Sequence, residues 1–61
     1  MIVILAFTGM ALYNISLIYQ RLGELPRALK CAREALRIWQ TSLPPEHEDI
    51  AYAMALLRNL G

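Results

Sequence analysis

The sequence predicts an all-α fold of antiparallel helix hairpins, and three observations lead to this prediction. Two breaks, at Gly23 and at Pro44 with Pro45, leave three stretches of helical length, at about 10–22, 26–42 and 47–60. Apolar residues recur in these stretches at the spacing of a helix face, and none shows the strict alternation of a strand. Because only short turns separate the stretches, consecutive helices are expected to lie side by side and antiparallel.

Composition narrows the function classes. The chain has 61 residues, of which 57% are hydrophobic and 18% are charged, and this composition excludes intrinsic disorder. A net charge of +1 provides no strong field for nucleic acid. A single cysteine excludes an internal disulfide framework. A chain of this length buries a marginal core, so we expect it to rely on neighbouring structure.

Residues 1–9 form an apolar N-terminal segment, which we interpret as a helix extension or a remnant. The run from Met1 to Tyr19 has no charged side chain and about the length of a membrane span. The alternative is therefore a small helical protein anchored in a membrane by residues 1–19. Polar or small residues interrupt this run, which makes the membrane anchor the less favoured interpretation; they are Gly9, Asn14 and Ser16.

Each predicted helix has its own pattern. The stretch 10–22 has an apolar stripe and a second, opposite stripe; the apolar one comprises Leu12, Ile15, Ile18, Tyr19 and Leu22. The stretch 26–42 is the most clearly amphipathic, with an apolar arc of Ala28, Leu29, Ala32, Ala35, Leu36 and Trp39. The stretch 47–60 has acidic residues near its start, where they favour the helix dipole; they are Glu46, Glu48 and Asp49.

The small and large residues of the first two helices fall at the spacing of a tetratricopeptide repeat. They are Leu12, Ile15, Ser16, Tyr19, Gly23, Ala28 and Ala35. In this pattern the small residues lie where the two helices cross. The connection that follows resembles the linker of a longer subtype of the repeat, which has about 42 residues and is typical of kinesin light chains and similar scaffold proteins. The residues that match this linker are Leu43, Pro45, His47, Asp49, Ile50 and Ala51.

The resemblance implies a first repeat at residues 10–43, followed at 44–61 by a linker and the first helix of a second, incomplete repeat, as part of an α-solenoid. Ala32 departs from the pattern, because the family usually has a bulky aromatic residue there, and we expect Trp39 or Tyr19 to fill the gap. The register of the third helix stays open; an offset of 42 residues, which places Ala53 on Ala11, fits the linker spacing best.

The resemblance also implies a surface that binds protein or extended peptide. The family residue at the position of Asn14 faces a concave groove and often hydrogen-bonds the backbone of a bound peptide. Arg21 suits an acidic side chain or a C-terminal carboxylate. The candidate residues share one face and are Tyr13, Asn14, Leu17, Gln20 and Arg21. Exposure to solvent, or packing on a neighbouring repeat, would suit these residues equally well.

No pattern indicates a catalytic, metal-binding or cofactor-binding site. His47 has acidic neighbours, but no second His or a Cys completes a ligand set, and a role at a helix start is favoured. Cys31 lies at the edge of an apolar arc, which suits a buried small residue rather than a nucleophile. The sequence thus predicts a non-catalytic, cytoplasmic scaffold or adaptor repeat that is a fragment of a longer array. Because both ends of the chain are apolar, we also expect it to self-associate in isolation.

Overall fold

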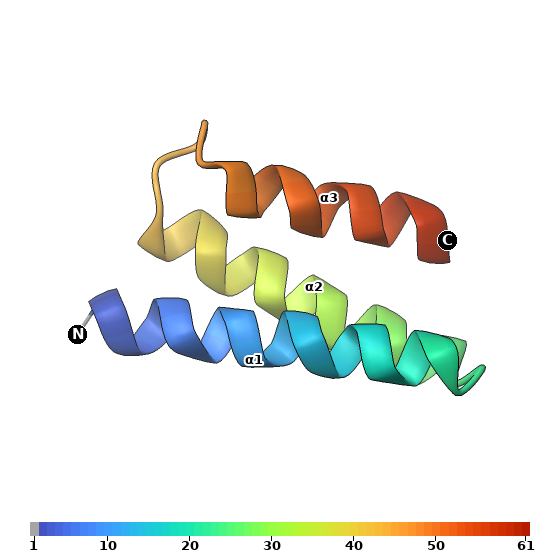
Figure 1. The fold of residues 1–61 in the computed structure, drawn as a ribbon. Helices are drawn as coiled ribbons and strands as arrows, with labels where there is room; N and C mark the ends of the chain where they lie inside the picture. Colours follow the sequence, from blue (N-terminus) through green and yellow to red (C-terminus); the bar gives the residue numbers. More distant parts are fainter. Residues whose placement is uncertain (1) are drawn as a thin grey trace.

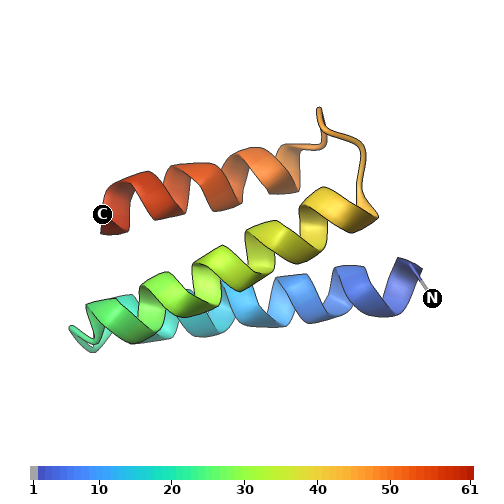
Figure 2. The same ribbon diagram turned by 180° about the vertical axis from the view of Figure 1, so that it is seen from behind.

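Three helices make up the chain in the computed structural model, which describes the backbone of residues 2–61 and the side-chain surroundings of residues 7–61. They are α1 (Ile2–Arg21), α2 (Leu25–Ser42) and α3 (Glu48–Leu60), and they confirm the predicted all-α fold. Figure 1 shows the three helices running back and forth, each antiparallel to the one before. Seen from behind in Figure 2, α2 crosses in front of α1 and leads up to α3.

Helix α1 is longer than its apolar periodicity suggested. It begins at Ile2 rather than near residue 10, so residues 2–9 continue the helix. It ends where the sequence places the first break, because Gly23 adopts a positive φ of 76° that side chains disfavour. The amide of Glu24 donates to the carbonyl of Tyr19 at 2.9 Å, and that of Gly23 donates to Gln20 at 3.1 Å. This hydrogen-bond pair is a Schellman motif, which turns the chain sharply back into α2.

Two proline signals set the bounds of α2. Pro26 lies in its first turn, where a missing amide hydrogen costs nothing because the first amides have no partner within the helix. At the other end, Leu43 is extended, as expected for a residue before a proline. Five residues after Leu43 the chain enters α3, whose first helical residue is Glu48.

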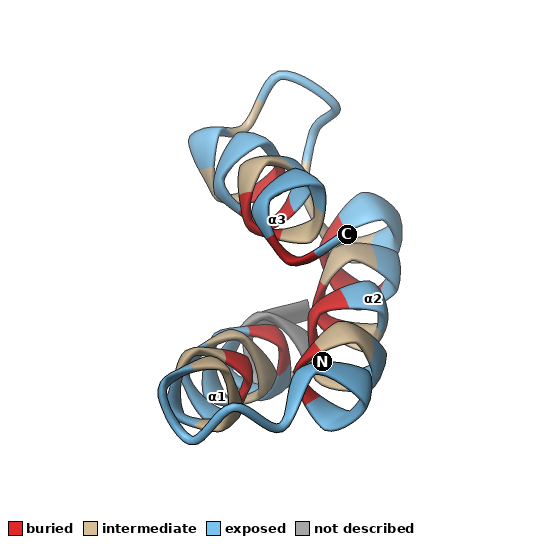
Figure 3. Ribbon diagram, turned by 90° about the vertical axis from the view of Figure 1, so that its right-hand side faces the viewer, coloured by how far each residue is buried: buried red, intermediate tan, exposed pale blue. Residues whose placement is uncertain are grey.

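The crossing of α1 and α2 is made of small residues. Ser16, Ala28, Ala32 and Ala35 have no exposed surface. The Ser16 hydroxyl donates to the carbonyl of Ala28 at 2.7 Å, so the two helix backbones lie close together. The expected placing of Ser16 and Ala28 at the crossing is confirmed by this bond. Figure 3 shows the buried residues of α2 facing both other helices.

Larger side chains fill the space around this crossing in two clusters. One joins Ala28 and Ala32 to Leu56 and Leu60 of α3, and Tyr19 packs against it. Tyr19, one of the two residues expected to fill the gap at the small Ala32, thus packs against the cluster that contains Ala32. The other cluster contains Trp39, Ile50 and Ala53. Trp39 is only 3% exposed, which confirms that its indole is buried.

Gly9 lies against this buried indole. A Cβ placed on Gly9 would fall 2.7 Å from Cδ1 of Trp39, closer than carbon atoms can approach. The sequence pattern treated Gly9 only as an interruption in an apolar run. In the structure, the absence of a side chain at Gly9 lets the Trp39 ring lie close against the α1 backbone.

The first prediction tests the crossing. Replacing Ala28 by Leu should lower the free energy of unfolding by about 1–3 kcal/mol, because the added methyl groups overpack a contact with no free space. Ala51→Leu is the matched control, since Ala51 is exposed on α3, and its effect should stay within about 0.5 kcal/mol. Urea unfolding followed by circular dichroism at one protein concentration measures both; equal effects would show that the crossing is not tightly packed.

The second prediction concerns Gly9. Alanine favours a helix over glycine by about 0.5–1 kcal/mol, yet Gly9→Ala should destabilise the chain by about 1–3 kcal/mol because its methyl group collides with Trp39. The same substitution in a Trp39→Leu chain should cost little, since the smaller side chain leaves room. A double-mutant cycle of unfolding free energies isolates this coupling; additive effects would contradict a direct Gly9–Trp39 contact.

Candidate functional site

The five candidate residues divide into two groups in the structure. All five residues lie on α1. Asn14 and Arg21 are exposed, whereas the side chains of Tyr13, Leu17 and Gln20 are half-buried. The five side chains therefore do not form one open surface.

Tyr13 and Leu17 are held by packing. The Tyr13 ring lies 5.7 Å from the Trp39 ring, centroid to centroid, at a tilt of 38°, a favourable arrangement for two aromatic rings. Tyr13 packs against both buried clusters, and Leu17 packs against the one that includes Leu56 and Leu60 of α3. These two side chains therefore join α1 to the rest of the fold.

Asn14 and Arg21 offer the free polar groups of this surface. They are seven residues apart, which places them two turns, or about 10 Å, apart along the same side of α1. Within residues 2–61 neither side chain has a hydrogen-bond or ion-pair partner. An amide and a guanidinium in this position can bind the backbone and a carboxylate of a peptide lying along the helix.

Helices α1 and α3 lie on the same side of α2. Seen end-on in Figure 3, α2 lies on one side of the molecule, and α1 and α3 lie on its other side, one below the other. Leu56 and Leu60 of α3 pack into the cluster that Tyr13 and Leu17 contact. The half-buried part of the candidate surface thus packs against the cluster that α2 and α3 form, while Asn14 and Arg21 are exposed to solvent.

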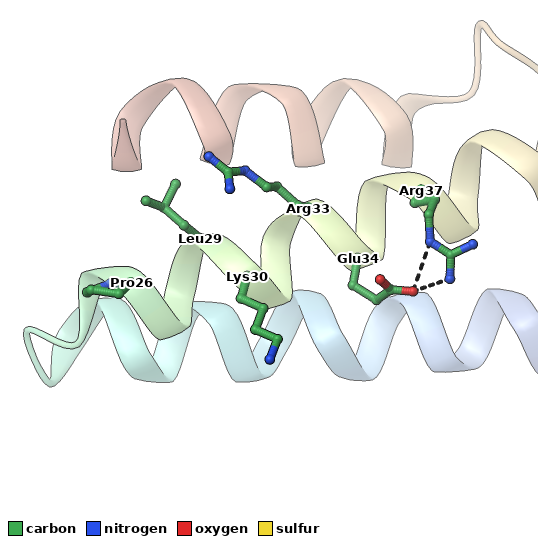
Figure 4. A pocket seen from close by; sticks show the side chains of 6 residues that line it. All are labelled: Pro26, Leu29, Lys30, Arg33, Glu34 and Arg37. Atoms are coloured by element: carbon green, nitrogen blue, oxygen red, sulfur yellow. Dashed lines mark hydrogen bonds and ion pairs between the residues drawn. The ribbon is translucent and has the colours of Figure 1, made fainter.

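A second surface runs along α2. A shallow hollow of about 540 Å³ is lined by Pro26, Leu29, Lys30, Arg33, Glu34 and Arg37. All six come from α2, and in Figure 4 Arg33 reaches toward α3 while Lys30 and Glu34 point the other way. A hollow lined by one helix is an open stretch of surface rather than an enclosed site.

Local ion pairs neutralise part of the charge on α2. Arg37 donates from Nε to Glu34 Oε2 at 3.0 Å, and its Nη2 also donates to the same oxygen. These bonds, with the charge of Arg37, hold the pKa of the Glu34 carboxyl below its usual value. Arg27 lies 3.7 Å from Glu24 and 6.0 Å from the centre of the Tyr19 ring. Pairs as exposed as these contribute little to stability.

His47 has a structural role at the start of α3. It is the N-cap residue, and its Nδ1 accepts a hydrogen bond from the amide of Asp49 at 3.1 Å. The Asp49 carboxylate lies 3.8 Å from the same nitrogen. Within residues 2–61, no three His, Cys, Asp or Glu side chains are grouped so that they could hold a metal ion. Cys31 is half-buried.

The membrane alternative is not favoured. Across the described chain, no helix combines the length and apolar character needed to cross a bilayer. Helix α1 covers most of the proposed anchor, but within this anchor it contains Asn14 and the buried Ser16.

Sequence reasoning missed one residue that shapes this region. Gly9 sets how closely the Trp39 ring approaches α1, and Trp39 in turn packs against Tyr13. The expected role of His47 at a helix start is confirmed, because His47 caps α3. The apolar stripe of 10–22 is also divided: Tyr19 packs inward, while Ile15, Ile18 and Leu22 are exposed.

Comparison with known proteins identifies a family. The family model described as tetratricopeptide repeat matches residues 8–49. This range contains most of α1, all of α2 and the turn that leads to the first residues of α3. No curated protein and no solved structure matches the chain at a significant level.

The third prediction tests the cap. His47→Ala should lower the free energy of unfolding by about 0.5–2 kcal/mol, because the Asp49 amide loses its acceptor. His47→Asn should largely keep the stability, since asparagine is among the best N-cap residues. Thermal unfolding of the three chains at pH 8 compares them, and equal losses for both variants would show that the imidazole stabilises α3 through something other than this hydrogen bond.

Proposed function

The chain belongs to the tetratricopeptide repeat family, whose repeats are in general non-catalytic modules of protein interaction, and we propose that it binds an extended peptide along α1. The observation that carries the proposal is the pair of exposed, unpartnered groups of Asn14 and Arg21, two turns apart. Tyr13 and Leu17 supply a rigid, half-buried floor beside them. Peptides bound in this way form hydrogen bonds through their backbone and direct a carboxylate to the arginine.

The expected partner is an extended segment with an acidic side chain or a free C-terminal carboxylate. Arg21 is well placed for the carboxylate because α1 ends there and the guanidinium has no acidic partner within residues 2–61. Asn14 can both donate to and accept from a peptide backbone. Gln20 stays in the proposed site as a half-buried neighbour of Arg21.

We also propose a finer assignment within the family. The linker residues suit the longer, kinesin-light-chain-like subtype, in which the chain would be a piece of a longer cytoplasmic scaffold array. The supporting observations are that the matched range extends to Asp49 and that His47 and Asp49 of this linker form the cap of α3. In such an array, neighbouring repeats would extend the surface that α1 begins.

The fourth prediction tests peptide binding. A five-residue peptide that ends in aspartate with a free carboxyl group should shift the backbone NMR signals of Asn14 and Arg21 when titrated onto the labelled chain. The same peptide with an amidated C-terminus and asparagine in place of aspartate should bind more weakly, because the charge-assisted bonds to Arg21 are lost.

Variants locate the binding. Arg21→Gln should weaken binding of the acidic peptide about tenfold or more, as expected for a lost hydrogen bond to a charged group. Asn14→Ala should weaken both peptides to the same degree. Arg33→Gln is the charge-matched control on α2 and should leave the affinity unchanged. An equal effect of Arg21→Gln and Arg33→Gln would show only non-specific attraction and would refute this site.

A further inference from the structure

The outer face of α2 is turned away from α1 and α3, which both lie on the opposite side of this helix (Figure 3). We call it the α2 basic face and define it by the residues that line the shallow hollow there, namely Pro26, Leu29, Lys30, Arg33, Glu34 and Arg37. Three of these side chains are basic and one is acidic. Because Lys30, Arg33 and Arg37 are exposed, the face presents positive charge to solvent.

The basic charges of this face are only partly neutralised within the chain. Its one acidic residue, Glu34, accepts two hydrogen bonds from Arg37, from Nε at 3.0 Å and from Nη2. Among residues 7–61, Lys30 and Arg33 have no hydrogen-bond or ion-pair partner. Two cations of the α2 basic face are therefore available to carboxylates from outside the chain.

These two cations lie on different sides of the hollow. In Figure 4, Leu29 and Arg33 lie on the side of α3, whereas Lys30 and Glu34 point the other way. Pro26 and Leu29 add apolar surface to the lining. A segment that lies along α2 would thus have a cation on each side and apolar surface beneath it.

The polar groups of this face determine which conformation of a partner fits it. Lysine and arginine side chains only donate hydrogen bonds, and the backbone groups within α2 are bonded along the helix. The amides of an extended peptide turned toward this face would lose water without gaining an acceptor, which is costly. A helix satisfies its own amides and presents only side chains, so a helix is the partner that the face accommodates.

We propose that the α2 basic face binds an acidic, amphipathic helix of another protein. The partner helix lies along α2, with glutamate or aspartate side chains on both sides of an apolar stripe, so that one side meets Arg33 and the other meets Lys30. The apolar stripe contacts Pro26 and Leu29. The stretch from Pro26 to Arg37 extends about 16 Å along α2, which matches about three turns of the partner. This surface lies on α2 and is therefore separate from the peptide-binding surface proposed on α1.

The first test uses an alanine-rich helical peptide of about 20 residues, with a leucine stripe between two rows of glutamates. Titrated onto the labelled 61-residue chain at low salt, it should shift the backbone NMR signals of Lys30 and Arg33, and its own helix content should rise. The same peptide with glutamine in place of every glutamate should bind about tenfold more weakly, because it lacks the ion pairs to both cations. Equal binding of the two peptides would overturn the proposal.

Variants test whether the peptide binds on α2. Lys30→Gln and Arg33→Gln should each weaken binding about two- to fivefold, as expected for an exposed ion pair. Arg21→Gln is the charge-matched control on α1 and should leave the affinity unchanged. Glu34→Gln should strengthen binding about two- to fivefold, because it releases Arg37, and a loss of folding could not produce such a gain. An equal loss for Arg21→Gln and Arg33→Gln, or no gain for Glu34→Gln, would refute this surface.

A final comparison separates the acidic helix from other binding partners. The five-residue peptide that tests α1 is too short to form a helix, so Arg21→Gln and Arg33→Gln should each affect only one of the two peptides. A single-stranded oligothymidine and vesicles that contain phosphatidylserine are titrated at the same salt concentration, and both should bind more weakly than the glutamate peptide. Tighter binding of either through Lys30 and Arg33 would overturn the assignment of this face to a protein partner.

Discussion

The close approach of α1 and α2 at Ser16 and Ala28 is the contact on which the remaining packing depends. A buried hydroxyl that donates to a main-chain carbonyl of the opposite helix fixes both the separation and the register of the pair. Only small side chains permit this separation, and Gly9 extends the same requirement toward the start of α1. With the first two helices so close, α2 can expose its alanines to α3 as well, and the leucines of α3 fill the space above them.

The main features of the fold follow from sequence patterns that act locally. Gly23 needs a left-handed conformation, and the prolines remove amide donors, so the breaks between helices could be placed from single residues. The start of α1 could not, because a helix whose residues are nearly all apolar has no periodic signal and no cap to mark its first turn. The buried state of Trp39 was predictable from the amphipathic arc of α2, whereas its contact with Gly9 joins residues far apart in sequence.

The candidate surface was predictable only as a set of residues on one helix face. The sequence shows which side chains share one face of a helix. Which of these side chains are buried depends on where the other helices lie, including α3. Leu17 packs against the cluster that contains Leu56 and Leu60, and the Tyr13 ring packs against Trp39, so two of the five candidate residues contribute to the packing of the helices. The exposed Ile15 and Ile18 show the same limit, since an apolar stripe can face a partner outside the chain as readily as a helix within it.

The single tryptophan lies at the end of the hairpin far from the Gly23 turn, where Gly9 and Trp39 meet. Contacts near the turn close short loops, whereas this contact closes a loop of thirty residues and loses more chain entropy. A hairpin that begins to fold at its Schellman turn therefore forms its remaining contacts progressively toward its open end, and the Trp39 indole packs against Gly9 last. Fluorescence in a stopped-flow refolding experiment would thus time the final closing step, while circular dichroism would record the earlier growth of the helices.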